Sequence, residues 1–286
     1  MKFLVFGATG QVARELRRHC PSDVAMAQLG RAEADLADPT GCAALIARTD
    51  ADVVINAAAY TAVDRAETEE ALALTVNGTA PAAMAQAAAA RGIPFLHIST
   101  DYVFDGSGTA PWQPDMPTGP LGAYGRTKRA GEQGVTAAGG THAILRTSWV
   151  FSAHGANFVK TMLRVGRERG AVRVVDDQFG GPTAAADIAA TLLRMAARFH
   201  VGSGRSGIYH YAGQPDVSWA DFAQEIFRQA RLDVTVTRIP TSDYPTPAVR
   251  PLNSRMDCTA LAAAFGIGRP DWRAALGSVL QELKEV

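Results

Sequence analysis

The sequence has few cysteines and no excess of charge of either sign, and both absences exclude classes of protein. Its 286 residues include three cysteines, Cys20, Cys42 and Cys258, and none forms a CxxC spacing. A small, odd number of thiols argues against a disulfide framework or a zinc site and favours a reducing compartment. Lysine plus arginine (28) equals aspartate plus glutamate (28). Because nucleic acids and anionic membrane surfaces attract proteins with a basic excess, we expect neither as a partner.

Metal-binding and membrane-spanning patterns are also missing. The six histidines are scattered without an HxxxH or HExxH spacing, so no metal site is indicated. No apolar run reaches the roughly 18 residues that a membrane span requires. The chain begins with a strand-like segment at residues 2–6 instead of a charged leader before an apolar region. These features predict a cytoplasmic protein.

Short apolar strands alternate with helices over about the first two hundred residues. We expect strands at residues 2–6, 52–59, 93–99, 143–151 and 172–175, a second strand ending near 28–31, and helices at 11–19, 77–91, 124–138, 157–169 and 185–199. Gly92 follows the alanine-rich helix at 77–91 as a C-terminal stop. The alternation predicts an α/β fold with a Rossmann-type, doubly wound parallel sheet.

The pattern changes after Gly202. A short strand at 208–212 precedes Ser218 and Asp221, which resemble a capping box for a helix over 222–231. A proline-rich stretch (240–251) and a last helix (272–285) follow. We predict that residues 1–150 form the NAD(P)-binding core, with further core elements to about residue 200. Residues from about 201 to 286 would form mainly a small substrate-binding lobe, interleaved with the core, at the carboxyl edge of the sheet.

Two features near the N-terminus indicate a dinucleotide site. Gly7 allows a tight turn after the first strand, and Gly10 lets the backbone approach a pyrophosphate at the helix N-terminus. An ordinary strand-to-helix turn is the alternative. Gly30 and Arg31 stand where NAD-binding proteins often carry an acid, and arginine suits the 2′-phosphate of NADPH. Arg31 therefore favours NADPH, with NADH as a second cofactor, unless it is only a solvated loop arginine.

Tyr124 and Lys128 are candidate catalytic residues. At helical spacing i and i+4 they share one face. A lysine ammonium would lower the tyrosine pKa from its usual value of about 10, which would make Tyr124 a proton donor and acceptor near neutral pH. Ser99, Thr100 and Asp101 end the preceding strand. A hydroxyl there can polarise a substrate carbonyl, and Thr100 is the favoured residue. For Ser99 the alternative is a buried hydroxyl bonded to backbone.

Longer segments resemble the dTDP-4-dehydrorhamnose reductase family of the extended short-chain dehydrogenase/reductase superfamily. They are NAAAYTAVDRAE (56–67), STDYVFDG (99–106), YGRTK (124–128), LRTSWVF (145–151), NFVKTML (157–163), DDQFGGPT (176–183) and YPTPAVRPLNSRMD (244–257). The similarity covers nearly the whole chain, and the last three segments are not general to the superfamily.

The resemblance implies that NADPH reduces the 4-keto group of dTDP-4-dehydro-L-rhamnose, the last step of dTDP-rhamnose biosynthesis. It implies that Tyr124 supplies the proton, that Lys128 holds the nicotinamide ribose and that Thr100 assists at the carbonyl. By the same resemblance, the other contacts are Gly10, Gln11, Val12, Asp35, Leu36, Ala57, Ala58 and Ala59 for the cofactor, and Thr100, Asp101 and Trp149 for the substrate.

The proline-rich stretch carries two arginines. Arg250 and Arg255, helped by Asn253, fit recognition of the anionic diphosphate, because arginine forks onto phosphate oxygens. The alternative is that these arginines form ion pairs that pin the lobe to the sheet.

A divalent cation is a further implication of the resemblance, because some members bind Mg²⁺ at a dimer contact through glutamates. Glu15, Glu282 and Glu285 are present, but Ala186 stands where another glutamate would be expected. Loss of one carboxylate weakens a site for a hard cation. The sequence therefore argues against Mg²⁺ and against the dimer that it would bridge, and predicts a monomer or weak homodimer.

Two other functions are compatible with these residues. One is a non-catalytic, NADP-binding regulatory subunit, such as the methionine adenosyltransferase subunit of the same family. The other is a nucleotide-sugar epimerase or dehydratase, which keeps NAD bound and usually has an acid after the second strand. Turnover of a keto sugar distinguishes the first from a reductase, and net consumption of NADPH distinguishes the second.

Overall fold

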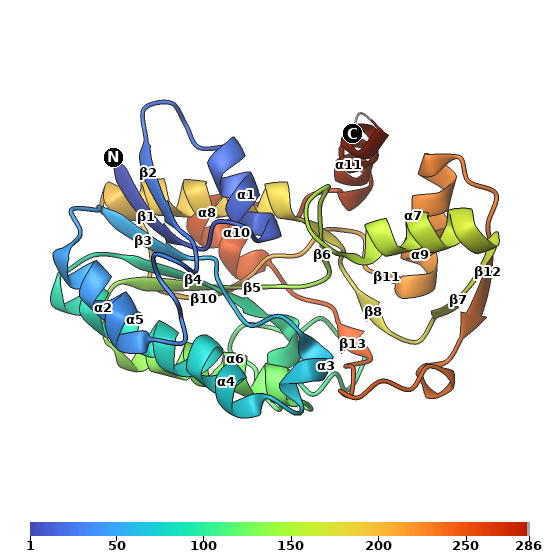
Figure 1. The fold of residues 1–286 in the computed structure, drawn as a ribbon, viewed down its shortest axis with the longest axis horizontal. Coiled ribbons are helices and arrows are strands. Elements are labelled where there is room, and N and C mark those ends of the chain that lie inside the picture. The colour runs from blue at the N-terminus through green and yellow to red at the C-terminus, as the bar shows by residue number, and fades with distance from the viewer. Residues whose placement is uncertain (285–286) are drawn as a thin grey trace.

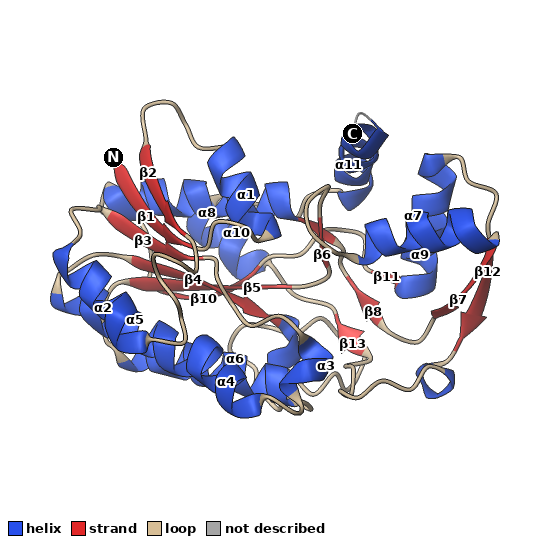
Figure 2. Cartoon of the chain, viewed as in Figure 1, coloured by secondary structure: helices blue, strands red, loops and turns tan. Residues whose placement is uncertain are grey.

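The computed structural model describes residues 1–284, and its main feature is a six-stranded sheet between two layers of helices (Figures 1 and 2). All neighbouring strands are parallel, in the order β10-β5-β4-β3-β1-β2. The strands are β1 (Lys2–Phe6), β2 (Ala25–Leu29), β3 (Val53–Asn56), β4 (Phe95–Thr100), β5 (His142–Thr147) and β10 (Gly207–His210). The order reverses between β1 and β3, which creates the crevice where such folds bind ligands. The predicted doubly wound α/β fold is confirmed.

Helices cover both faces of this sheet. One layer contains α2 (Pro39–Arg48), α3 (Val63–Ala66), α4 (Glu70–Leu74), α5 (Ala80–Ala90) and α6 (Ala123–Ala137), and the other α1 (Gln11–Arg18), α8 (Ala185–His200) and α10 (Thr259–Phe265). No helix within residues 1–284 combines the length and apolar character that crossing a membrane requires.

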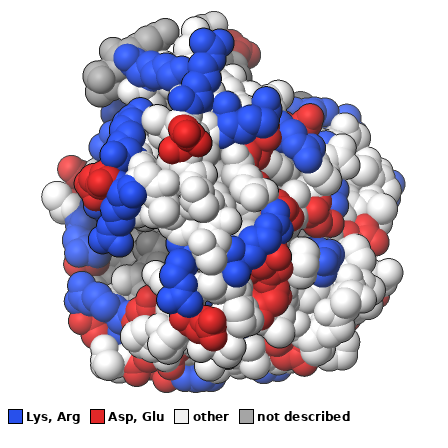
Figure 3. Space-filling view, turned by 90° about the vertical axis from the view of Figure 1, so that its right-hand side faces the viewer, with Lys and Arg blue, Asp and Glu red and all other residues white. Residues whose placement is uncertain are grey.

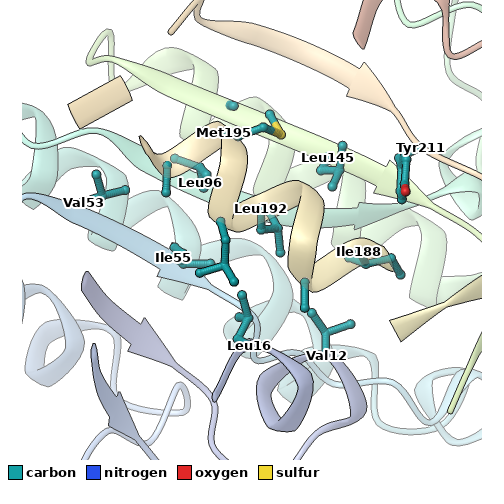
Figure 4. Close-up of a cluster of buried hydrophobic side chains, with 14 of the residues drawn as sticks. Val12, Leu16, Val53, Ile55, Leu96, Leu145, Ile188, Leu192, Met195 and Tyr211 are labelled. Atoms are coloured by element: carbon teal, nitrogen blue, oxygen red, sulfur yellow. The ribbon is translucent and has the colours of Figure 1, made fainter. Parts of the chain in front are cut away.

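The core is divided by the sheet. Alternate side chains of β1 point to opposite faces, so that Phe3 and Val5 join one cluster and Leu4 and Phe6 the other. In the cluster beneath α1 and α8, apolar side chains from both helices meet those of the central strands (Figure 4). The labelled residues are Val12, Leu16, Val53, Ile55, Leu96, Leu145, Ile188, Leu192, Met195 and Tyr211. Each fully buried aliphatic chain of this size contributes about 1.5–3 kcal/mol.

Two strands end earlier than the sequence predicted. β3 stops at Asn56, because the Asn56 Oδ1 accepts a hydrogen bond from the Ala58 amide (3.1 Å) and turns the chain out of the sheet. β5 stops at Thr147, and Trp149 has a left-handed φ of 49°. Beyond it, β6 (Val150–Phe151) pairs with β9 (Thr183–Ala184) instead of extending the main sheet. After both of these strands the chain leaves the main sheet at its carboxyl edge.

The helical segments differ from expectation in several places. Helices α3, α4 and α10 were not predicted, and the helix predicted at 222–231 begins at Trp219. The helix predicted at 77–91 begins earlier, because α4 runs through a π-helical segment (Thr75–Thr79) into α5. Pro81, which has no N–H to donate, closely follows the π-helical segment, where the regular helical hydrogen-bond pattern is interrupted. Helix α2 was not predicted, since its start contains proline and glycine. Asp38 caps it by accepting a hydrogen bond from Gly41 N (2.9 Å).

A second group of elements, on the right of Figure 1, packs around its own apolar cluster. It contains α7 (Phe158–Arg169), β7 (Ala171–Val175), β8 (Phe179–Gly180), β11 (Val217–Ser218), α9 (Trp219–Ala230), β12 (Thr235–Ile239), β13 (Asn253–Ser254) and α11 (Trp272–Lys284). Ser218 and Asp221 form the predicted capping box. Glu285, which we predicted as the end of the last helix and considered for Mg²⁺, lies outside the described residues. The division of the chain into two domains stays a prediction.

The face formed by this second group carries charges of both signs, and Figure 3 shows basic and acidic side chains interspersed over it. Several of them pair. Arg238, for example, lies 2.7 Å from Asp176 and 2.6 Å from Asp221. Such pairs bring opposite charges together, so that the fields of the paired side chains partly cancel.

Candidate active site

A cleft of about 750 Å³ lies at the carboxyl edge of the main sheet. Its walls come from the turn after β1, the end of β2, the segments after β3, β4 and β5, and the start of α6. The cleft has the size of a cofactor pocket. It brings together the residues that we predicted for the cofactor, which are Gly7, Gly10, Gln11, Val12, Arg31, Asp35, Leu36, Ala57, Ala58, Ala59, Tyr124 and Lys128.

The two predicted glycines differ in what surrounds them. Gly7 has a φ of +109°, and a Cβ there would lie 3.2 Å from the backbone of Ala57. A Cβ on Gly10 would meet nothing within 4 Å. The open space at Gly10 lies in front of the N-terminus of α1, where free N–H groups and the helix dipole favour an anion. This cradle fits the pyrophosphate of a dinucleotide.

Alanine substitutions at these glycines should separate folding from binding. We expect Gly7→Ala to lower the free energy of unfolding by about 1–3 kcal/mol, because its φ is unfavourable for any side chain. We expect Gly10→Ala to fold normally but to bind NADPH about tenfold more weakly, because the methyl group enters the pyrophosphate space. Urea unfolding and fluorescence titration with NADPH measure the two effects. Normal NADPH affinity in Gly10→Ala would contradict this placement.

Buried polar atoms in the cleft are further signs of a ligand site. Ser99 Oγ, Thr147 Oγ1 and Asp101 Oδ2 are buried and have no hydrogen-bond partner among residues 1–284. An unsatisfied buried polar atom costs about 1–3 kcal/mol, so such atoms are rarely kept without a role. The residues of the cleft therefore fit a polar dinucleotide together with a polar substrate.

Lys128 is the most buried charged residue of the cleft. It lies one turn after Tyr124 on α6, as predicted, and only 2% of its surface is exposed. Its Nζ donates a hydrogen bond to the carbonyl oxygen of Ile98 at 2.6 Å. Burial lowers the pKa of Lys128 to about 8, although the charge of Glu132 opposes the shift. Near neutral pH its protonation is therefore easily changed.

The pKa of Tyr124 is shifted in the direction opposite to our prediction. Burial raises it to about 12, the charge of Asp101 adds to the increase, and a hydrogen bond with Thr100 opposes it. The prediction considered only the ammonium of Lys128. Desolvation of the phenolate outweighs that effect, and Lys128 has itself lost part of its tendency to be charged. Tyr124 is therefore protonated at neutral pH, which is the state that can donate a proton.

Thr100 and Asp101 line the cleft beside Tyr124, as predicted for substrate contacts. Thr100 Oγ1 donates to Asp101 Oδ1 (3.0 Å) and accepts from Tyr102 N (3.2 Å). Burial raises the pKa of Asp101 to about 6, against hydrogen bonds from Ser254 and Thr100. Thr100 and Tyr124 thus line the same cleft.

Trp149, the third predicted substrate contact, lines the cleft from the segment after β5. Its indole stacks on Trp219 of α9, with ring centroids 3.6 Å apart. A positive φ is uncommon for an aromatic residue, and such strain is often found at functional sites. Trp149 therefore joins the cleft to the second group of elements.

The residues that we predicted for the diphosphate lie outside the lining of the cleft. Arg250 Nη2 donates to both carboxylate oxygens of Asp64 at 2.9 Å, which ties the C-terminal segment to α3. The Asn253 amide donates to the carbonyl oxygens of Ser107 and Ala110. For Arg250 this is the pinning arrangement that we named as the alternative. Recognition of a diphosphate by Arg250 and Asn253 stays a prediction.

Several lining residues were not selected from the sequence. They directly follow strand ends, as do Thr61 and Val63 after β3, Tyr102 after β4, and Thr147 and Ser148 at the end of β5. The Tyr102 ring lies edge-on to that of Tyr124, with centroids 5.6 Å apart. Position after a strand end was the signal that could have found them, since ligands in these folds bind at that edge.

Two of the glutamates considered for Mg²⁺, Glu15 and Glu282, already have basic partners within the chain. The buried Glu15 lies 3.0 Å from His154 Nε2 and 3.2 Å from His19 Nε2. Arg18 lies 2.6 Å from Glu282 and 3.9 Å from Glu15, so that one guanidinium faces both carboxylates and balances one of their two charges. Mg²⁺ requires oxygen ligands in near-octahedral geometry. Among residues 1–284, no group of three or more His, Cys, Asp or Glu side chains could hold a metal ion.

Comparison with known proteins assigns the chain to a family. A family model described as the RmlD substrate binding domain matches residues 1–285. The chain belongs to the RmlD substrate binding domain family. Curated relatives agree with this membership. A dTDP-4-dehydrorhamnose reductase from Burkholderia thailandensis is 44% identical over 298 residues, with 99% of each chain covered.

Solved structures of RmlD-type proteins share the whole fold. A dTDP-4-dehydrorhamnose reductase from Clostridium acetobutylicum superposes with a TM-score of 0.93 at 35% identity, and the alignment covers 99% of this chain and 100% of that one. The reductase from Bacillus anthracis, solved in complex with NADP, has a TM-score of 0.92 at 30% identity and coverage of 98% and 99%. The RmlD family fold therefore extends over the cleft and over the second group of elements.

Proposed function

We propose that this protein is a dTDP-4-dehydrorhamnose reductase, which converts dTDP-4-dehydro-L-rhamnose to dTDP-L-rhamnose with NADPH. The observation that carries the proposal is the convergence of Tyr124, Lys128 and Thr100 in one cleft with the glycine turn of β1. A proton donor, a cation and a hydroxyl beside a dinucleotide cradle are the groups that reduction of a carbonyl requires. Full-length relatives with that name support the substrate assignment.

Tyr124, Thr100 and Lys128 each have a separate role in the reaction. When bound, NADPH supplies the hydride for C4 of the sugar. Tyr124, protonated at neutral pH, donates its proton to the keto oxygen as negative charge develops there. Thr100 can hold that oxygen when its hydroxyl proton turns from Asp101 Oδ1 toward the substrate. Lys128, in its charged form, stabilises the phenolate left on Tyr124.

Turnover tests the proposal. Purified protein mixed with NADPH and dTDP-4-dehydro-L-rhamnose should oxidise one NADPH for each sugar reduced, which is followed by the loss of near-ultraviolet absorbance. A folded, NADPH-binding protein without turnover would favour the regulatory-subunit interpretation. Conversion of a nucleotide sugar without net NADPH consumption would favour an epimerase or dehydratase.

We propose that Arg31 selects NADPH over NADH. The side chain is exposed at the end of the cleft, where it can donate to a 2′-phosphate. We expect Arg31→Ala to raise the KM for NADPH about tenfold and to leave the KM for NADH unchanged, because one charge-assisted hydrogen bond contributes about 1.5–3 kcal/mol.

The matched control is Arg14→Ala, since Arg14 is an exposed arginine whose Nε is already bonded to the carbonyl oxygen of Thr9 (3.1 Å). Steady-state kinetics of the wild type and both variants, each with NADPH and with NADH, gives the six KM values. Equal KM values for NADPH in the wild type and in Arg31→Ala would make Arg31 a solvated loop residue.

The two parts of the chain are proposed to divide the ligands between them. Residues 1–150, with core elements to about 200, would hold NADPH, and residues from about 201 to 286 would serve mainly the substrate. The Trp149–Trp219 stack supports this division, since it brings α9 to the rim of the cleft. Arg250 could reach a diphosphate only by exchanging the carboxylate of Asp64 for phosphate oxygens.

We further propose a cytoplasmic protein that is a monomer or a weak homodimer and needs no divalent cation. The three cysteines are free, in keeping with a reducing compartment. Arg18, between Glu15 and Glu282, supplies the positive charge that a metal would otherwise bring. Sedimentation with Mg²⁺ and with a chelator should give the same mass, and a dimer that depends on Mg²⁺ would contradict the proposal.

A further inference from the structure

A buried histidine lies directly behind Lys128 and has no part in the chemistry described so far. His97 belongs to β4 and has no exposed surface. Its Nδ1 lies 3.1 Å from Asn56 Nδ2, and its Nε2 lies 3.4 Å from Lys128 Nζ. The imidazole ring therefore connects the end of β3 with the catalytic lysine on α6.

The Asn56 amide decides which ring nitrogen of His97 carries the proton. Asn56 Oδ1 accepts a hydrogen bond from Ala58 N (3.1 Å), so that the NH₂ group of Asn56 faces the ring. An NH₂ group only donates, and His97 Nδ1 must therefore accept and carry no proton. Burial, with the charge of Lys128, holds the pKa of His97 well below its usual value, so the ring is neutral. Its single proton is then on Nε2.

This proton points at the Nζ of Lys128. An ammonium group has three donors and no acceptor, so a charged Lys128 meets the Nε2–H of His97 donor to donor. A neutral amine has a lone pair that can accept the same hydrogen bond. The contact therefore favours the neutral form of Lys128, in the same direction as burial.

Other charged and titratable groups near Lys128 act on it differently. Glu132, on the same helix, favours the ammonium form, but Arg146 of β5 neutralises Glu132 at 2.6 Å. Tyr124 on α6 and Asp101 after β4 line the same cleft. Among these neighbours, the His97 ring contacts Nζ directly and offers it a hydrogen-bond donor.

We propose that His97 is a positioning residue of the active site, whose Nε2–H holds Lys128 poised between ammonium and amine. This role rests on the proposed function, because Lys128 supports Tyr124 in that reaction. A poised Lys128 can stabilise the phenolate, pass a proton to it after turnover and then take up a proton from solvent. A permanently charged lysine could do only the first.

The tautomer can be tested without substrate. Long-range ¹H–¹⁵N spectra of protein labelled at histidine distinguish protonated from unprotonated ring nitrogens. We expect His97 to have a protonated Nε2 and an unprotonated Nδ1. A protonated Nδ1 at His97, either alone or in an imidazolium, would overturn the proposal.

His210 is a matched internal control for these spectra. It is also fully buried in the main sheet, on β10, but its Nδ1 faces the carbonyl oxygen of Trp112 (3.0 Å) and its Nε2 faces Arg146 Nη1 (3.3 Å). A carbonyl only accepts and a guanidinium only donates, so His210 should show the opposite tautomer. The variants His97→Gln and His210→Gln assign the two sets of signals.

The pH profile of kcat/KM tests the consequence for Lys128. Activity requires charged Lys128, so it falls as the pH rises through the pKa of Lys128. In His97→Gln the amide can turn its oxygen toward the ammonium, which raises that pKa. We expect the alkaline limb to move up by about one pH unit, the effect of one hydrogen bond that stabilises a single protonation state. His210→Gln should leave the limb in place. An unmoved limb in folded His97→Gln would overturn the proposal.

A second variant serves if His97→Gln does not fold, and a second measurement serves if the wild type has no reductase activity. Should His97→Gln fail to fold, Asn56→Asp takes its place. Its carboxylate accepts from Nδ1–H, turns the lone pair of Nε2 toward Lys128 and should move the limb in the same direction. If the wild type catalyses no reduction, titration of the ¹³Cε signal of Lys128 in both proteins reads the same shift without turnover. Failure of the proposed function is thereby separated from failure of the His97 proposal.

Discussion

Replacing Tyr124 with phenylalanine is expected to lower kcat for reduction of dTDP-4-dehydro-L-rhamnose by about 10²- to 10⁴-fold, the usual contribution of a positioned general acid. The change removes only the hydroxyl. The ring keeps its edge-on contact with Tyr102, so the cleft should keep its shape. NADPH should still bind, because the glycine turn and Arg31 are untouched. Loss of NADPH absorbance measures kcat, and calorimetric titration measures NADPH binding.

The control for this prediction is Tyr60→Phe. The Tyr60 hydroxyl donates to Glu69 Oε2 at 2.6 Å and lies outside the lining of the cleft. Its loss should leave kcat within about twofold of the wild type, as for most substitutions away from a site. Should Tyr124→Phe keep more than a tenth of wild-type kcat while Tyr60→Phe is normal, another group must donate the proton.

Replacing Arg146 with methionine is expected to lower the free energy of unfolding by about 3–5 kcal/mol, because it leaves a buried charge without a partner. Arg146 Nε and Nη2 donate to the two carboxylate oxygens of Glu132 at 2.8 and 2.6 Å. Only 3% and 4% of the two side chains are exposed. Urea unfolding followed by circular dichroism measures the change.

Two further variants show whether the buried carboxylate is the cause. Removing both charges, in Arg146→Met with Glu132→Leu, should restore most of the lost stability. The matched control is Arg126→Met, since Arg126 makes the same two-pronged contact with Glu70 (2.9 and 2.8 Å) but both side chains are almost half exposed. It should cost less than about 1 kcal/mol. Equal losses for Arg126→Met and Arg146→Met would contradict the explanation.

The features of this protein that the sequence alone determined are those encoded over a few residues. Alternating apolar strands and helices indicated the doubly wound sheet, and Gly7 and Gly10 marked the dinucleotide turn. The spacing of Tyr124 and Lys128 placed both on one helical face. Each of these rests on local backbone geometry, with a period of 2 or 3.6 residues or a tight turn, which a short stretch of chain specifies by itself.

Only the tertiary structure decided which partners these residues have. Asn56 ends β3 and orients His97, and Arg250 pairs with Asp64, which lies 186 positions away in the sequence. Tyr124 has a raised pKa where the sequence suggested a lowered one, because burial by distant segments outweighs a neighbouring lysine. Desolvation and hydrogen-bond partners depend on segments brought together by folding, and no local pattern specifies them.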